Sequence, residues 1–345
     1  MSIDHGAGRV LAVDGGGAKT DLALLDPTGG LLSFVRGGRS HVHYVGIEGS
    51  IVVVKALLES AINRAGLDPL DRPPASAAYV LLAGADLPEE RSAIQARIER
   101  LEWSTSLVVD NDTLALLRAG TDRGWGVAVV CGAGINCLGR APDGREVRFL
   151  SLGPLSGDWG GGGDMGMAAL AAAARGVDGR GPRTVLESSV PSHFGLTDPL
   201  ELARAIHLRH IAENRLGELA PLVLAASDED PVAAGIVKRL ADEVIAFARA
   251  ALLRLELIRA DADVVLGGRV LRSIGPSVVQ AIAEGVGEAA ASARVLVAPS
   301  EPIVGAALLG LDALGAASSA KDRARAGLDA AVADIESEAA TTTSM

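Results

Sequence analysis

The sequence predicts an α/β protein made of two related domains. Short apolar strand patterns alternate with longer stretches in which apolar residues recur at helical spacing. A strand, a turn of small residues and a second strand occur at 8–26 and again at 126–140. The 345 residues are too many for one compact core. We therefore expect each copy of the repeated pattern to open a domain, and the two domains to face one another across a cleft.

The expected elements follow the chain in order. In the first half we expect strands at 8–14, 20–26, 31–35, 77–82, 105–109 and 126–130, and helices at 47–65 and 113–119. In the second half we expect a specially shaped glycine-rich loop at 157–166, helical stretches at 167–175, 198–226 and 231–259, strands at 263–266 and 294–298, and a helix at 302–314. The predicted domains are 8–112, completed by a helix at about 303–330, and 113–302, with a partly disordered polar tail at 331–345.

Composition and charge limit the class of partner. Hydrophobic residues make up 49% of the chain and charged residues 22%, as in a globular protein with a large core. The net charge is −11 and no basic block occurs, so we expect neither nucleic acid nor a membrane as a partner. The apolar runs are short, and no signal peptide is evident. Only Cys131 and Cys137 occur, which gives no disulfide framework and favours a cytoplasmic location.

The first candidate motif is the run from Asp14 to Asp21. A strand ends on Asp14, and the glycines that follow allow a sharp turn whose N–H groups could point at phosphate. An ordinary hairpin turn needs only one or two glycines, so phosphate binding is the favoured interpretation. Asp14 is the candidate ligand of a hydrated Mg²⁺. The candidate phosphate-binding residues are Gly15, Gly16, Gly17, Ala18, Lys19 and Thr20.

Two further glycine turns are candidates for nucleotide binding. Gly132, Ala133, Gly134 and Asn136 repeat the logic of the first turn, although in isolation they would suit a plain hairpin. Gly267, Gly268 and Arg269 follow a strand and could lie beside a base and ribose, or simply connect a strand to a helix.

A carboxylate pair follows the strand at 105–109. Asp110, Asn111 and Asp112 could cap the next helix, bind a metal or activate a hydroxyl, and capping is compatible with chemistry at a neighbouring residue. Phosphoryl transfer needs one carboxylate close to the attacking hydroxyl. Asp112 is the candidate base, and Asp110 is the weaker alternative.

The glycine-rich run at 156–164 is a candidate sugar-binding loop. Its carboxylates could accept hydrogen bonds from sugar hydroxyls or favour an ammonium group, and a tryptophan is unusual in a flexible linker. Ser40 and His41 form a second segment that could contact a sugar. The candidate substrate-binding residues are Ser40, His41, Asn111, Asp158, Trp159, Gly160 and Asp164.

These motifs together resemble the actin-like ATPase superfamily and, within it, the N-acetylglucosamine kinase family. Asp14–Asp21 and Gly132–Cys137 resemble the two phosphate motifs, Leu266–Val270 resembles the adenosine motif, and Asn111-Asp112 resembles the family's Asn-Asp. The resemblance covers roughly residues 9–314. It implies two ribonuclease-H-like domains, ATP and Mg²⁺ as cofactors, transfer of the γ-phosphoryl to a sugar 6-hydroxyl, and a homodimer.

This chain departs from the family at residues that are expected to surround the sugar. Met165 stands where the family carries a glutamate, and Ser40-His41 replaces a Ser/Thr-Asn pair that precedes a histidine. Asp158 is an additional acid that could pair with a free 2-ammonium group, so glucosamine is the favoured substrate over N-acetylglucosamine or another hexose. An ATPase activator of a 2-hydroxyacyl-CoA dehydratase and a non-catalytic ATP-binding scaffold are the alternatives from other classes.

Overall fold

Packing divides the chain into two compact units in the computed structural model, which describes residues 8–68 and 73–343. The first unit contains residues up to Gly124 together with those from Ala298 onward, and the second is Trp125–Val297. The division therefore falls later than the predicted 112 and slightly earlier than the predicted 302. The helix that follows Asp112 stays with the first unit because it packs against the helix at Pro302–Ala313.

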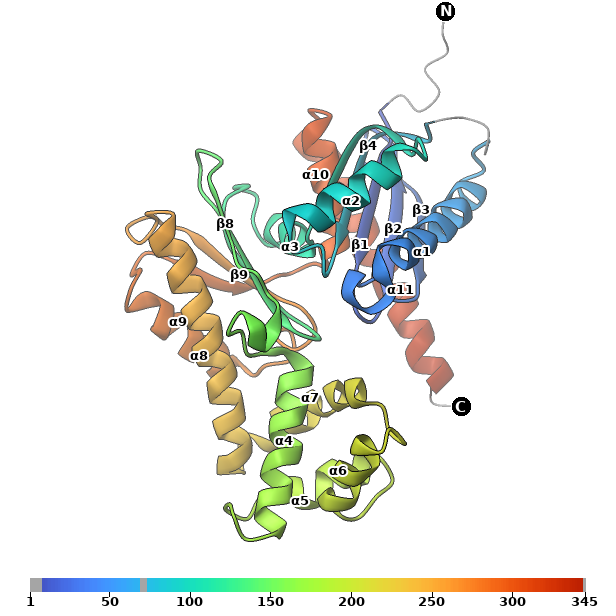
Figure 1. Ribbon diagram of the computed structural model, residues 1–345. Coiled ribbons are helices and arrows are strands. Elements are labelled where there is room, and N and C mark those ends of the chain that lie inside the picture. The colour runs from blue at the N-terminus through green and yellow to red at the C-terminus, as the bar shows by residue number, and fades with distance from the viewer. Residues whose placement is uncertain (1–7, 69–72, 344–345) are drawn as a thin grey trace, which may run out of the picture. The chain divides into compact units, whose positions relative to one another are not determined.

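The first unit is built on a five-stranded sheet in the order β3-β2-β1-β4-β5 (Figure 1). β1, β2 and β3 form an antiparallel meander, whereas β1, β4 and β5 run parallel. The strands are β1 (Val10–Gly15), β2 (Thr20–Leu25), β3 (Leu31–Gly37), β4 (Ala75–Leu82) and β5 (Ser104–Asp110). The helices are α1 (Val42–Arg64), α2 (Pro88–Glu99), α3 (Asp112–Gly120), α10 (Pro302–Ala313) and α11 (Ser318–Thr343).

Both faces of β1 are buried, as its apolar run Val10–Val13 predicts. Leu11 and Val13 point to the core under α1 and α2. The opposite face lies against α10, where a side chain at Gly310 would come within 2.3 Å of Val10 Cγ1. This close approach makes α10 an integral part of the sheet's packing.

The second unit repeats the same topology. Its sheet has the order β10-β9-β6-β7-β8, with an antiparallel β6-β7-β8 meander and parallel β6, β9 and β10. The strands are β6 (Gly126–Cys131), β7 (Ile135–Arg140), β8 (Glu146–Arg148), β9 (Asp263–Gly267) and β10 (Arg294–Val297). The helices are α4 (Gly161–Val177), α5 (Leu186–His193), α6 (Pro199–His207), α7 (Ala220–Ala226), α8 (Pro231–Arg254) and α9 (Pro276–Gly287), with 3₁₀ turns at Gly153–Leu155 and Glu213–Leu219. The internal duplication expected from the sequence is thus present as a shared strand order.

Three sequence-based expectations about elements were wrong. The glycine-rich run does not remain a loop through Gly166, because α4 begins at Gly161 and its glycines pack against neighbouring backbone. The helical stretch at 198–226 is broken into α6, a 3₁₀ turn and α7. The polar tail is not disordered over 331–343: α11 runs to Thr343, with Leu328 and Val332 buried, and residues 344–345 lie outside the described residues.

A helical interruption marks the start of α1. The helix was expected from 47, but its first turn begins at Val42, and Gly46 has the non-helical angles φ 71° and ψ 168°. A positive φ of this kind is readily adopted by glycine. Within the described ranges, no helix combines the length and the apolar character that a membrane span requires.

Candidate active site

The carboxyl ends of β1, β4 and β5 meet at one edge of the first sheet and carry most of the predicted chemistry. Gly15 lies opposite Leu82 in the pairing of β1 with β4, and Leu81 lies opposite Asp110 in the pairing of β4 with β5. Parallel strands place the residues after their carboxyl ends side by side. Asp14, the loop after Leu82 and the Asn111-Asp112 pair therefore share this edge.

Backbone hydrogen bonds fix the shape of the turn after β1. The N–H of Gly16 donates to the carbonyl of Lys19 at 2.9 Å, and the N–H of Ser40 donates to the carbonyl of Gly16 at 3.2 Å. Gly15 has no room for a side chain, since a Cβ there would lie 2.3 Å from Ser40 Oγ. Gly16, Gly17 and Ala18 lie further out, and Ala18 is exposed. The loop thus presents backbone toward solvent, as a phosphate-binding turn requires.

Lys19 is held by two carboxylates. Its Nζ lies 2.8 Å from Asp21 Oδ2 and 3.3 Å from Glu301 Oε2. Asp21 is fully buried and also receives two hydrogen bonds from Arg36, at 2.6 and 2.8 Å. Burial lowers the pKa of Lys19, but the two carboxylates outweigh it and raise the pKa. The ammonium is therefore charged and fixed beside the turn.

Two predicted hydroxyl ligands are fully buried in the first unit. The Thr20 hydroxyl lies 2.6 Å from the carbonyl oxygen of Gly38 and 2.8 Å from Ser40 Oγ. Ser40 and Thr20 are both 0% exposed. These bonds hold the β1–β2 turn to the segment before α1, so both residues support the turn; their ligand contacts stay predictions.

Asp14 and Asp112 form the electrostatic centre of this edge. Burial is the largest cause that raises the pKa of Asp14 well above its ordinary value, and Asp21 and Asp112 add to it. Burial, followed by the charge of Asp86, raises the pKa of Asp112 to about 7. Carboxylates crowded in this way are the kind of donor set that a divalent cation stabilises. Asp14 therefore fits the role of an Mg²⁺ ligand through the ion's hydration shell.

Asn111 fixes the start of α3 beside the candidate base. Its side-chain oxygen accepts from the N–H of Thr113 at 2.9 Å, and its Nδ2 donates to Asp86 Oδ1 at 2.8 Å. The capping alternative is therefore realised at Asn111, while Asp112 occupies the first position of the helix. Asp110, by contrast, accepts from the N–H of Asn111 and lies 3.8 Å from Arg91.

The segment before α1 lies against the loop after β4. His41 Nδ1 accepts from the N–H of His43 at 3.2 Å, and the His41 ring stacks on Tyr44 with centroids 4.2 Å apart. Burial, and then the nearby His43, lowers the pKa of His41 to about 4, so its ring is neutral at pH 7. Because Nδ1 already accepts a hydrogen bond, Nε2 of the neutral imidazole carries the hydrogen and can donate it, which suits the predicted contact with a sugar hydroxyl.

In the second unit, the three predicted glycine segments converge on the β6–β7 turn. The N–H of Gly162 donates to the carbonyl of Gly132 at 2.8 Å, and the N–H of Gly163 donates to that of Ala133 at 3.2 Å. On the other side, Gly268 has a φ of +84°, and a Cβ there would lie 2.5 Å from the carbonyl oxygen of Cys131. The adenosine-type turn, the second phosphate-type turn and the start of α4 thus form one backbone-rich surface.

Two flanking residues of these turns have side chains of different exposure. Arg269 is exposed, and Asn136 is half-buried with its Oδ1 2.6 Å from the N–H of Cys137. Cys131 and Cys137 are buried, and burial raises the pKa of Cys131 to about 12. Neither thiol is therefore available at the surface to hold a metal cluster, which weighs against the dehydratase-activator alternative.

The predicted sugar loop packs beside α8. Asp164 Oδ2 accepts from the N–H of Gly160 at 2.9 Å, and Asp158 accepts from the Ser156 hydroxyl. The Arg239 guanidinium lies 4.0 Å from the centre of the Trp159 ring. Met165 is 0% exposed, so the residue that replaces the family's glutamate is part of the hydrophobic core of this unit.

α8 contributes charged residues that the sequence did not single out. The pKa of Glu243 is raised, chiefly by burial, with Asp158 adding to the effect and Arg239 opposing it. Asp86 and Glu301 were missed in the first unit. Asp86 follows β4 at the carboxyl end of the first sheet, which is the signal that identified Asp112 and could have identified Asp86 as well, whereas Glu301 is the N-cap residue of α10.

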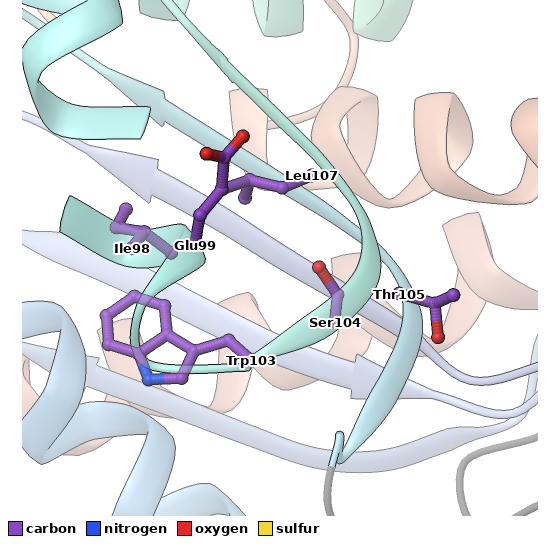
Figure 2. A pocket seen from close by; sticks show the side chains of 6 residues that line it. All are labelled: Ile98, Glu99, Trp103, Ser104, Thr105 and Leu107. Atoms are coloured by element: carbon purple, nitrogen blue, oxygen red, sulfur yellow. The ribbon is translucent and has the colours of Figure 1, made fainter. Parts of the chain in front are cut away.

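A cavity of about 320 Å³ lies at the opposite end of β5 from Asp110 (Figure 2). None of the predicted site residues lines it. Its lining residues are Ile98, Glu99, Trp103, Ser104, Thr105 and Leu107.

Comparison with known proteins agrees with these features. A family model described as the BadF/BadG/BcrA/BcrD ATPase family matches residues 11–310. The chain belongs to this ATPase family. The predicted family is thereby confirmed, and the relatives described next confirm the two-domain α/β fold and an enzyme of the sugar-kinase type.

Individual proteins resemble the chain over most of its length. An N-acetylmuramic acid/N-acetylglucosamine kinase of Clostridium acetobutylicum is 28% identical over 77% of this chain and 86% of its own. An N-acetyl-D-glucosamine kinase of Dictyostelium discoideum is 24% identical over 88% of this chain and 97% of its own. A solved structure from Chromobacterium violaceum, a candidate N-acetylglucosamine kinase, superposes with a TM-score of 0.69 at 25% identity and covers 88% of this chain and 98% of its own.

Proposed function

We propose that this ATPase-family member is an amino-sugar kinase that transfers the γ-phosphoryl group of ATP to the 6-hydroxyl of N-acetylglucosamine. The observation that carries the proposal is Asp112. It lies at the carboxyl edge of the first sheet beside Asp14, and its pKa of about 7 suits a group that must gain and lose a proton near neutral pH. The relatives named above are N-acetylglucosamine kinases, which supports the acetylated sugar.

Asp112 acts as the general base in this proposal. Its carboxylate accepts the proton of the sugar 6-hydroxyl as that oxygen attacks the γ-phosphorus. The bond between the new oxygen and phosphorus forms while the bond to the β-phosphate oxygen breaks, giving the sugar 6-phosphate and ADP. Asn111 fixes the backbone of Asp112 through the cap of α3, so the carboxylate is oriented before substrate arrives.

The phosphates are assigned to the glycine turns. The backbone of Gly15, Gly16 and Gly17 and the ammonium of Lys19 supply donors in the first unit, and Gly132 to Gly134 supply backbone in the second. When bound, Mg²⁺ would neutralise phosphate charge, and Asp14 would hold it. The Gly267–Arg269 turn is assigned to the adenosine.

Glucosamine is the second candidate substrate, because two acids lie near the sugar loop. Asp158 and Glu243 interact electrostatically, and such a pair would favour a free 2-ammonium group. Arg239, stacked on Trp159, opposes that preference because it places a cation in the same region. The acetamide of N-acetylglucosamine carries no charge and avoids this repulsion.

ADP release on a panel of sugars tests the proposal. The panel contains N-acetylglucosamine, N-acetylmuramic acid, glucosamine, glucose, mannosamine and no sugar, each at saturating ATP. We expect the strongest stimulation by N-acetylglucosamine. A clear preference for glucosamine would assign the acids of the sugar loop to ammonium binding, and no stimulation by any sugar would favour a non-catalytic scaffold.

Asp112→Asn separates catalysis from binding, and Asp110→Asn, two residues earlier in the chain, is the matched control. We expect Asp112→Asn to lower kcat by about 10²–10⁴-fold while ATP still binds, because only the proton acceptor is lost. Asp110→Asn should retain most of the activity. Equal activity of the two variants would reject Asp112 as the base. A cytoplasmic location and a homodimer stay predictions.

A further inference from the structure

Three side chains at the same sheet edge form a compact ligand set outside the proposed phosphate and magnesium sites. His43 comes from the first turn of α1, Asp86 from the loop after β4, and Glu90 from the first turn of α2. One ligand atom of each lies within 4.8 Å of the others. His43 Nε2 is 3.0 Å from Glu90 Oε1 and 3.8 Å from Asp86 Oδ2. Ligands bound to one transition-metal ion are separated by distances of this size, because metal–ligand bonds are about 2.0–2.2 Å.

The second oxygen of each carboxylate is held by the protein. Glu90 Oε2 accepts from the N–H groups of Asp86 at 3.0 Å and Leu87 at 2.9 Å. Asp86 Oδ1 accepts from Asn111 Nδ2 at 2.8 Å. Both carboxylates are therefore oriented with the other oxygen toward the imidazole. Hydrogen bonds of this kind are what fix the ligands of a metal site before the ion arrives.

The backbone is shaped to bring these loops together. Gly84 has a φ of +81°, and a Cβ at this position would lie 2.7 Å from His41 Nδ1 and 3.1 Å from the backbone nitrogen of His43. The N–H of Val42 also donates to the carbonyl of Ala83 at 3.0 Å. The approach of the α1 start to the β4–α2 loop is therefore an ordered feature rather than a chance meeting of long side chains.

The charge and the solvent exposure of these three side chains suit a bound cation. The side chain of Asp86 is 5% exposed, that of Glu90 21% and that of His43 35%, so the acids lie inside and the imidazole lies at the entrance. With a neutral imidazole the set carries two negative charges.

We propose that His43, Asp86 and Glu90 bind a divalent transition-metal ion such as Zn²⁺, at a site separate from the Mg²⁺ of the nucleotide. One imidazole nitrogen with two carboxylate oxygens is a donor set for zinc or a neighbouring first-row ion, whereas Mg²⁺ is bound by oxygen and water. The site goes beyond the proposed function and does not depend on it. Because Asp86 also holds Asn111, a bound ion would influence the residue next to the candidate base.

Calorimetric titration of the metal-stripped full chain with ZnCl₂, without nucleotide or sugar, tests the site. We expect His43→Ala and Glu90→Gln each to lower the affinity for one equivalent of zinc by about tenfold or more. His193→Ala is the matched control: His193 Nε2 also lies 2.9 Å from a carboxylate, that of Glu218, but it belongs to no three-ligand set in the described part of the chain. This control should bind zinc with the affinity of the unchanged protein. In both proteins, millimolar Mg²⁺ should not displace the bound zinc.

Cobalt provides a second readout that reports the ligands directly. Co²⁺ bound to nitrogen and oxygen ligands at low coordination number should give visible absorption in the unchanged chain and in His193→Ala, and lose it in His43→Gln. Circular dichroism of each variant checks that it is folded. Unchanged zinc affinity in both His43→Ala and Glu90→Gln, or displacement of the bound zinc by millimolar Mg²⁺, would overturn the proposal.

Discussion

Asp112 has a pKa of about 7 because it is buried and because Asp86 carries a nearby negative charge. A general base must be ionised, so we expect kcat/KM to rise with pH through about 7 and then level off. In Asp86→Asn the second cause is removed, and the rise should move to lower pH. The asparagine can still accept from Asn111, so the helix cap is retained. A pH–rate profile that is identical in the two proteins would contradict this assignment.

The same raised pKa has a cost in stability. Between the ordinary value of 3.8 and about 7, the folded protein holds a proton on Asp112 that the unfolded chain has lost. Stability therefore falls as pH rises through this window. Asp112→Asn carries no such group, so we expect its Tm to exceed that of the unchanged protein by a few degrees at pH 8. The gain should shrink toward pH 4, which thermal melts at the two pH values would measure; an equal difference at both would exclude the linkage.

At the level of the secondary-structure elements, glycines let the turns around β6 approach one another. Gly268 has a φ of +84° and lies against the carbonyl of Cys131, whereas Gly144 has a φ of +87° with nothing within 4 Å of a built Cβ. Gly144→Ala should therefore cost only the backbone strain, about 1–2 kcal/mol. Gly268→Ala should cost more, because the Cβ would also displace rigid backbone. Urea unfolding of the two variants measures the difference, and equal losses would show that the close contact is easily relieved.

At the scale of the whole molecule, the two units differ in how the chain builds them. The second unit is the continuous segment Trp125–Val297, whereas the first needs α10, which comes from the far end of the chain. A side chain at Gly305 would lie 1.9 Å from the carbonyl oxygen of Ala115, so α10 and α3 are closely interlocked. We expect a 125–297 fragment to fold with a cooperative thermal transition, as followed by near-ultraviolet circular dichroism.

A fragment that ends at residue 124 provides the comparison. It lacks α10 and exposes the face of β1 that carries Val10, so we expect it to have no cooperative transition. Adding residues 298–345 as a separate chain should restore the cooperative transition if the contacts with α10 are sufficient to fold this unit. A cooperative transition in the isolated 1–124 fragment would show instead that α10 is dispensable for this unit.

The sequence by itself determined the fold and the family. Strand patterns that end in glycine turns repeat with enough regularity to predict two domains, because buried strands and tight turns impose local rules on composition. The same logic located Asp14, Asn111 and Asp112 at strand ends. The same patterns also predicted that the Gly132 and Gly268 turns serve one site. In the second unit these two turns lie close together, as their hydrogen bonds and close backbone contacts show.

Only the tertiary structure decided which elements the ambiguous segments form and which residues share an environment. The glycines from Gly161 onward enter a helix because their missing side chains allow close packing against the β6–β7 turn and the 3₁₀ turn, a gain that no local propensity contains. α11 forms because its apolar residues, such as Leu328, are buried in the first unit. The set of His43, Asp86 and Glu90 likewise arises from segments far apart in sequence, since long-range packing rather than spacing places them together.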